Sequence, residues 1–183
     1  MERPALKTNL RKYCFAAVFT ALCAVCAQIQ IPLPMVPINL ALFAVHLAGA
    51  LLGAKFGTAA IAAYVLLGAL GAPVFAGFAG GMQIIAGKTG GYIIGYLLAA
   101  LIAGLLRARW GLNFWKLCLA MALGTAACYL FGTVWFMVVT GMGLWMSLVY
   151  CVFPFLIGDA LKIALAAYLT VRLDAPLKKI GGI

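Results

Sequence analysis

Two oppositely charged residues, Asp159 and Lys162, stand in the last apolar stretch of this chain, and their types and spacing suit polar recognition. The whole sequence has only 3 acidic residues, so an aspartate among aliphatic side chains is unusual. An ionisable group inside a membrane segment costs ~2.5–3.5 kcal/mol and usually marks a functional site. Because residues three apart share a helix face, the pair can offer a solute both an acceptor and a donor. A purely structural salt bridge between helices is the alternative.

The residues that catalysis would need are scarce. The chain has one histidine, His46, and no glutamate besides Glu2, while Asp174 lies in a basic C-terminal tail. General acid–base chemistry would have to use Asp159 and Lys162 without a second acid or a metal beside them. The sequence therefore predicts binding without catalysis, so we do not expect an enzyme.

Cofactor and metal motifs are incomplete. Cys23 and Cys26 form a CxxC pair, but no second pair or cluster of histidines accompanies it, so we interpret the 6 cysteines as packing residues. The run GMQIIAGKTG resembles a nucleotide-binding loop, yet Met82 stands where that loop requires glycine. We expect no cofactor, no metal and no nucleotide.

The elements that must position the charged pair are membrane helices. Hydrophobic residues make up 67% of the chain and charged residues 9%, a composition that a soluble domain does not have. A span needs roughly 20 apolar residues. Six such stretches are expected as helices: 13–31, 38–54, 57–72, 91–106, 114–140 and 147–171. The sequence thus predicts an all-α membrane protein, a six-transmembrane-helix bundle in a single domain over 1–183.

The charge of the connections indicates how the bundle is oriented. The net charge is +10, and lysines and arginines gather before residue 13, at residue 55, over 107–116 and after residue 171. Connections 32–37 and 141–146 carry none, so both termini are expected in the cytoplasm. The same distribution argues against a nucleic-acid partner. Lys88 is the only cation expected on the outer side.

Two outer connections have unusual compositions. Residues 32–37 contain three prolines, which exclude helix and favour an extended crossing. Residues 71–91 contain seven glycines yet stay apolar. Irregular backbone at membrane depth is tolerated where it is buried in protein or lines a cavity. We therefore expect this glycine-rich segment to act as a lid, with a loop dipping into the headgroups as the alternative.

A candidate substrate site can be assembled from the outer ends of these elements. Its polar members are Asp159, Lys162, Lys88, Thr89, Tyr92, Gln83 and Asn39, with Gln30 as a further amide. Its apolar walls are Phe75, Phe78, Tyr96, Phe153 and Phe155. Two lysines with one aspartate suit a monoanion that carries a neutral hydrogen-bonding head. The remaining tyrosines and the tryptophans are mostly interpreted as interfacial anchors or packing residues.

Several motifs together resemble the BioY family. They are PVFAGFAGG, GKTGGYIIGY and FPFLIGDALKIALAAYL, with IPLPMVP and LAGALLG in support. The resemblance covers most of the chain. It implies the fold of the biotin-binding S components of energy-coupling-factor (ECF) transporters, with biotin as the transported ligand. The implied partner is an ECF module, made of a transmembrane coupling protein and two ATPases.

The resemblance also implies roles for particular residues. The Gly-Asp-x-x-Lys element falls on Gly158, Asp159 and Lys162 as ligand contacts, and the TGGY run places Thr89, Gly91 and Tyr92 in the site. The helix-1 AxxxA surface falls on Ala17 and Ala21, which are expected to dock on the coupling protein.

Two positions depart from the family pattern. Lys88 stands where many members have proline, and Ala41 stands where a glutamine is often seen. The second departure puts a ligand contact from the second helix in doubt.

The predicted function is high-affinity biotin binding for uptake across a bacterial cell (inner) membrane. Two alternatives stay open at this point. One is an S component for another small anionic vitamin or precursor. The other is a non-transport membrane scaffold that uses the Asp159–Lys162 pair as structural glue.

Overall fold

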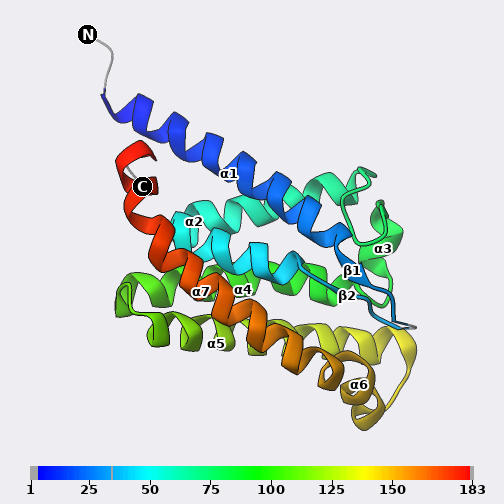
Figure 1. Ribbon diagram of the computed structural model, residues 1–183. Coiled ribbons are helices and arrows are strands. Elements are labelled where there is room, and N and C mark those ends of the chain that lie inside the picture. The colour runs from blue at the N-terminus through cyan, green and yellow to red at the C-terminus, as the bar shows by residue number, and fades with distance from the viewer. Residues whose placement is uncertain (1–3, 34, 182–183) are drawn as a thin grey trace.

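The computed structural model describes residues 4–33 and 35–181 and is almost entirely helical (Figure 1). The elements in chain order are α1 (Pro4–Gln28), β1 (Gln30–Ile31), β2 (Ile38–Asn39), α2 (Ala41–Ala69), α3 (Met82–Ala86), α4 (Gly90–Trp110), α5 (Phe114–Thr140), α6 (Leu144–Cys151) and α7 (Phe153–Gly181).

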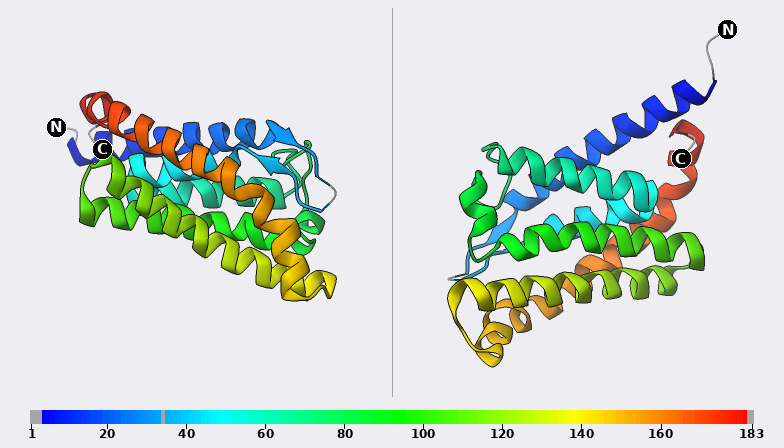
Figure 2. Two further views of the ribbon diagram at one scale, coloured as in Figure 1. Left: turned by 60° about the horizontal axis from the view of Figure 1, so that its bottom comes forward. Right: turned by 180° about the vertical axis from the view of Figure 1, so that it is seen from behind.

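The long helices run lengthwise beside one another (Figure 2). The start of α1 and the end of α7 lie at the same end of the bundle, together with the α4–α5 connection; we call this the terminal end. The two short strands, α3 and α6 lie at the opposite end, called the strand end. The fold therefore separates the basic connections from the glycine- and proline-rich ones.

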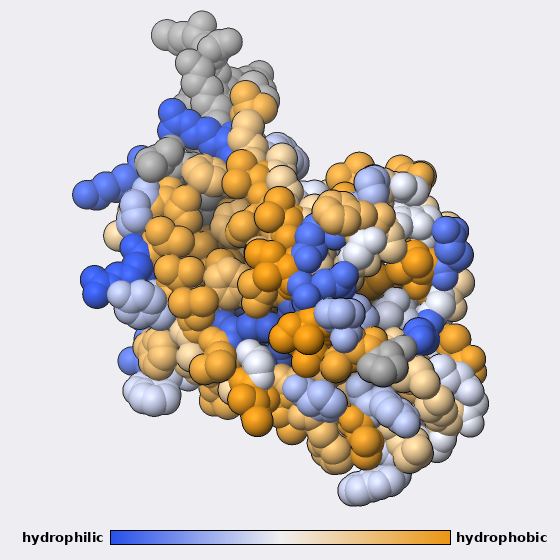
Figure 3. Space-filling view, turned by 45° about the vertical axis from the view of Figure 1, so that its right-hand side comes forward, coloured by the Kyte–Doolittle hydropathy of each residue, from blue (hydrophilic) through white to orange (hydrophobic). Residues whose placement is uncertain are grey.

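The helices have the length and surface of membrane spans. Among the described residues, five helices are long and apolar enough to cross a bilayer. Large apolar side chains on α5 and α7 point outward, among them Leu130, Val138 and Ile157, which are 71%, 79% and 80% exposed. Apolar residues also cover most of the face drawn in Figure 3. The chain is a multi-pass membrane protein.

The predicted six-helix count is not confirmed, because most of the predicted stretches 38–54 and 57–72 lies in a single element, α2, which counts as one candidate span. Gly53 interrupts it with a φ of 76° and a ψ of 175°, values outside the helical region. The chain reverses direction there (Figure 1). Glycine adopts positive φ at little cost, so this residue permits the reversal.

Close backbone contacts fix α4 against its neighbours. A Cβ added at Gly49 of α2 would lie 2.4 Å from Ala100 O of α4. One at Gly124 of α5 would lie 2.9 Å from Ala99 O. Small residues let helices approach closely where lipid offers no hydrophobic driving force. The α2–α4–α5 unit is therefore packed backbone to backbone.

The described residues of the proline-rich connection, 32–33 and 35–37, contain no helix, as the prolines predicted, but the chain bends at residues 35–36 instead of running extended. β1 and β2 pair antiparallel, with Gln30 opposite Asn39 and Ile31 opposite Ile38. The helices on either side therefore end earlier and begin later than predicted. α1 ends at Gln28 instead of residue 31, and α2 begins at Ala41 instead of residue 38. The strand pairing uses backbone groups that a helix through residues 29–31 or 38–40 would have needed.

The predicted helix 147–171 is divided in two. α6 ends at Cys151, and α7 begins at Phe153 after Val152, whose φ of −123° and ψ of −58° lie outside the helix. Pro154 explains the restart, because its ring is tolerated in a first helical turn and it lacks an N–H. The break places Asp159 in an early turn of α7.

α7 also continues beyond the predicted end at residue 171, to Gly181. Asp174, expected in a basic tail, is instead a helical residue that is only 5% exposed and pairs with Arg107 of α4. A buried charge needs such a partner. The contact ties α4 to α7 at the terminal end.

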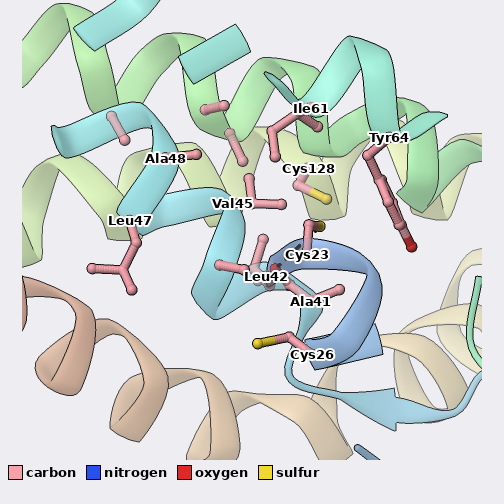
Figure 4. Close-up of a cluster of buried hydrophobic side chains, with 14 of the residues drawn as sticks. Cys23, Cys26, Ala41, Leu42, Val45, Leu47, Ala48, Ile61, Tyr64 and Cys128 are labelled. Atoms are coloured by element: carbon pink, nitrogen blue, oxygen red, sulfur yellow. Dashed lines mark hydrogen bonds between the residues drawn. The ribbon is translucent and has the colours of Figure 1, made fainter. Parts of the chain in front are cut away.

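The interior is apolar with isolated polar groups. Cys23 and Cys26 lie in the buried cluster of Figure 4 beside Leu42 and Val45, and all 6 cysteines are free thiols. His46 is fully buried, and its Nε2 lies 2.8 Å from Thr125 Oγ1. These residues serve packing and helix contact, as was expected for the cysteines.

Candidate ligand-binding site

A cavity of about 310 Å³ lies at the strand end. Its lining comes from the β1–β2 connection, α2, the glycine-rich segment and helices α4 to α7. The lining residues are Leu33, Met35, Val36, Pro37, Asn39, Leu42, Tyr64, Phe75, Ala76, Ala79, Ile84, Lys88, Thr89, Tyr92, Ile93, Tyr96, Cys128, Tyr129, Cys151, Phe155, Asp159 and Lys162. A mostly apolar hollow with a few polar groups is the usual form of a small-molecule site.

The charged pair predicted from the sequence lines this cavity. Lys162 Nζ lies 2.7 Å from Asp159 Oδ1, and the two residues are 8% and 4% exposed. The hydroxyl of Tyr129, on α5, donates to Asp159 Oδ2. Both carboxylate oxygens therefore have a partner, as a charge buried in a low-dielectric setting requires. The pair borders open space, so it is available to a ligand.

Lys88 and Thr89 reach the cavity from the connection between α3 and α4. Lys88 Nζ lies 3.9 Å from Met35 Sδ of the β1–β2 connection, and Thr89 is the N-cap residue that precedes α4. Trp135 of α5 donates from Nε1 to Gly87 O at 3.0 Å, which fixes the backbone just before Lys88. A second cation is thus held over the cavity by irregular backbone.

Tyr92, Asn39 and Phe75 also line the cavity. Tyr92 Oη lies 3.0 Å from Thr133 Oγ1, so its hydroxyl is oriented by α5. Asn39 accepts from Ala41 N at 3.0 Å through Oδ1, which leaves its amide N–H₂ group for other partners. The Phe75 ring packs edge-on against Tyr64, with 5.5 Å between centroids.

Two of the predicted site residues lie outside the cavity. Gln83 is exposed and donates to Gly80 O at 3.2 Å within the glycine-rich segment, because α3 turns its side chain outward. Gly91 is buried against Trp135 of α5, where an added Cβ would lie 2.3 Å from the tryptophan Cβ. It permits close helix packing.

Only some of the residues predicted as apolar walls line the cavity. Tyr96 and Phe155 line the cavity, whereas Phe78 and Phe153 are 72% and 45% exposed and Gln30 is not among the lining residues. The sequence reasoning missed Tyr64 and Tyr129, which it grouped with interfacial and packing aromatics. The one signal in the sequence was that both lie inside apolar helices, where a tyrosine hydroxyl needs a partner.

Ala17 and Ala21, predicted as a docking surface, do not line the cavity. Both are exposed on α1, next to Val18 at 61% exposure and Val25 at 62%. The opposite face of α1 carries Cys23, which is fully buried. The two alanines therefore belong to an outward, apolar face.

Comparison with known proteins decides the family. A family model described as the BioY family matches residues 1–179. The chain belongs to the BioY family. The resemblance read from its motifs is thereby confirmed.

Curated relatives match over nearly their whole length. A protein named biotin transporter BioY from Thermotoga maritima is 41% identical over 165 residues, which is 90% of this chain and 96% of the relative. A probable biotin transporter BioY from Pyrococcus horikoshii is 41% identical over 158 residues, covering 86% of this chain and 93% of that protein.

A solved structure shares the fold. The crystal structure of the S-component for biotin from an ECF-type ABC transporter superposes with a TM-score of 0.86 at 26% identity, and the match covers 94% of each chain. The arrangement of helices described above is therefore the S-component fold.

Proposed function

We propose that this chain is the biotin-binding membrane subunit of an ECF-type uptake system, a transporter subunit rather than an enzyme. The observation that carries the proposal is the cavity at the strand end, where Asp159, Lys162 and Tyr129 meet beneath Lys88. Its volume of about 310 Å³ is near the lower end of the range for small-molecule sites, ~300–1,000 Å³. The names of the relatives support biotin as the ligand.

The chemistry of biotin matches this lining. Its ureido ring presents two N–H donors and a carbonyl, which suit the carboxylate of Asp159 and the donors of Tyr129 and Lys162. Its bicyclic body is apolar and suits walls such as Phe75 and Phe155. Its valerate is an anion, which suits Lys88, a second cation that lines the cavity. Thr89, Tyr92 and Asn39 supply the remaining polar contacts in this proposal.

The glycine-rich segment 71–91 acts as the lid of the site in this proposal. Phe75, Ala76 and Ala79 form part of the cavity wall, and Lys88 follows α3 in the same segment. Its apolar side chains can lie against the bundle, and its glycines let the backbone follow the cavity closely. Ligand then enters from the strand end.

The proposed topology has six crossings with both termini in the cytoplasm. The reversal at Gly53 divides α2 into two shorter crossings, which with α1, α4, α5 and α7 makes six. The basic residues near the terminal end, such as Lys55 and Arg109, then follow the positive-inside rule. The strand end with its cavity faces outward across a bacterial inner membrane.

The proposed partner is an ECF module of a coupling protein and two ATPases. The exposed face of α1 around Ala17 and Ala21 supports this, because small residues let a second membrane helix approach closely. The chain would obtain the energy for uptake from that module.

One comparison of two aspartates on α7 tests the proposal. Asp159→Asn removes the carboxylate in the cavity, and Asp174→Asn removes the other buried carboxylate, which pairs with Arg107 away from the cavity lining. Both variants should lose stability, because a buried ion pair is broken, typically at a cost of ~3–5 kcal/mol. In the folded fraction of each purified variant, only Asp159→Asn should fail to bind labelled biotin.

Three outcomes of this test separate the candidate functions. Retained biotin binding by Asp159→Asn overturns the proposed site. Equal loss of binding in both variants indicates that the Asp159–Lys162 pair is a structural ion pair and does not recognise the ligand. Failure of the parent chain to bind biotin, with binding of another small anionic vitamin or precursor, indicates an S component of different specificity.

A further inference from the structure

Gln28, the last residue of α1, contacts one short stretch of the glycine-rich segment through its whole side-chain amide. Its Nε2 donates to Phe75 O at 3.1 Å and to Val74 O at 3.3 Å. Its Oε1 accepts from Phe78 N at 2.9 Å. The same nitrogen also lies 3.2 Å from Ala24 O, one turn earlier in α1, which orients the side chain. We call residues 74–79 the strap.

The arrangement of donors and acceptors fits an amide and no other side chain of this length. Two carbonyl oxygens of the strap face the amide nitrogen, and one N–H faces the amide oxygen. A glutamate would place a carboxylate oxygen against those carbonyls, and a leucine would leave all three strap groups without this partner. The contact is therefore specific to glutamine at position 28.

The strap forms one wall of the cavity. Phe75, Ala76 and Ala79 line it, and a Cβ at Gly68 of α2 would lie 2.1 Å from the Phe75 ring, so that ring sits directly on the helix backbone. The position of Phe75 depends on the strap backbone, since Phe75 N donates to Ala79 O at 3.0 Å across a tight turn.

The turn within the strap is strained, so it needs external support. Phe78 has a φ of 55°, in the left-handed region that residues other than glycine rarely adopt. Its side chain is 72% exposed and thus adds little packing to hold that conformation. The hydrogen bond from Phe78 N to Gln28 is a direct restraint on the strained residue.

We propose that Gln28 latches the strap over the cavity and so sets the rate at which a bound ligand leaves. Gln28 is not among the cavity-lining residues, so it is a positioning residue that acts through Phe75 and its neighbours. The proposal rests on the proposed function for the identity of the ligand. The latch itself is a property of the chain and can be measured without ligand.

The experiment compares Gln28→Leu and Gln28→Glu with Thr20→Val in the full-length chain. Thr20 is a matched control, because it is a buried α1 residue whose hydroxyl donates to Ala60 O of α2 at 2.8 Å and does not touch the strap. Labelled biotin is bound and then chased with unlabelled biotin to give the dissociation rate. Both Gln28 variants should release biotin about tenfold faster or more, as expected for losing several hydrogen bonds.

The dissociation rate separates a latch from general destabilisation. A variant that merely unfolds lowers the fraction of protein that binds, without changing the dissociation rate of the molecules that do. Thr20→Val should therefore keep the parent dissociation rate. Parent-like release by both Gln28 variants, or equally accelerated release by Thr20→Val, overturns the latch while leaving the proposed function intact.

A second measurement on the ligand-free chain keeps the latch testable if biotin is not the ligand. Amide hydrogen exchange of the peptide that covers the strap should be faster in both Gln28 variants than in the parent chain and Thr20→Val. The Phe78 amide is the direct reporter, because its N–H is the one held by Gln28. Unchanged exchange overturns the latch, whatever the parent chain binds.

Discussion

The two buried aspartates of α7 have the same chemistry and different surroundings. Asp159 pairs with Lys162 and Tyr129 and borders the cavity. Asp174 pairs with Arg107 and does not line the cavity. A buried ion pair alone therefore does not define a site in this protein. The open volume beside Asp159 is what favours ligand recognition there.

One prediction concerns Tyr129, whose hydroxyl donates to the Asp159 carboxylate oxygen that does not contact Lys162. Tyr129→Phe keeps the ring and removes the donor to Oδ2. Hydrogen bonds to charged groups contribute ~1.5–3 kcal/mol, so the dissociation constant for biotin should rise about tenfold or more. Equilibrium binding of labelled biotin measures this.

Tyr150→Phe is the matched control for that change. Tyr150 lies on α6, is 36% exposed and does not line the cavity. Removing the hydroxyl of Tyr150 should leave the dissociation constant for biotin unchanged. Parent-like affinity in Tyr129→Phe would remove this tyrosine from the proposed site.

The sequence predicted cavity-lining residues best where a charged side chain stands among apolar ones. Asp159 and Lys162 stand out because charges are rare in membrane segments. Tyr129 did not stand out, because tyrosines are common near membrane interfaces and nothing local shows that one faces an aspartate. Gln83 was predicted as a site residue but does not line the cavity, because the short helix α3, which has no clear signal in a glycine-rich segment, turns it outward.

At the scale of elements, the chain breaks its helices at glycine and proline. α2 reverses at Gly53, and α7 restarts beside Pro154. The sequence placed the first interruption two residues later, between stretches 38–54 and 57–72, and it predicted 147–171 as one helix. Boundaries are hard to read when apolar residues run up to the turn itself, as LAGALLG (residues 47–53) does here. The break at Val152 could be expected from Pro154, but the separate helix α6 could not.

Gly53→Ala tests whether the reversal depends on glycine. An alanine at a φ of 76° and a ψ of 175° is strained, because this region is essentially restricted to glycine, and the change should lower the free energy of unfolding by ~1–3 kcal/mol. Space is not the cause, since no atom lies within 4 Å of an added Cβ. Thermal unfolding in detergent measures the loss.

Gly143→Ala provides the comparison for Gly53. Gly143 also has open space around an added Cβ, but its φ of −67° suits any residue. It should unfold like the parent chain. Equal stability of the two variants would show that positive φ at residue 53 is not what the turn requires.

At the scale of the whole molecule, charge and irregular structure are divided between the two ends. The α4–α5 connection and both chain ends bring basic residues to the terminal end, whereas Lys88 is at the strand end near Met35. The positive-inside pattern could be read from the sequence because it depends only on composition and order. The cavity could not, because its lining comes from segments far apart in the chain.

Cysteine labelling from the two sides of the membrane tests the proposed topology. In a chain whose native cysteines are replaced, Gly143→Cys at the strand end should react with an impermeant thiol reagent in intact cells. Arg109→Cys at the terminal end should react only after lysis. Both positions are exposed. The reversed pattern would place the cavity on the cytoplasmic side.

The tight contacts along α4 limit how a solute can travel. Below the cavity, toward the terminal end, Gly49 meets Ala100 and Gly104 meets Ala54 with no room for even one methyl group. A permeation pathway through that half would require α2 and α4 to separate along both contacts. If the chain translocates its ligand as proposed, we expect the whole subunit to reorient in the bilayer, because that movement leaves these helix contacts intact.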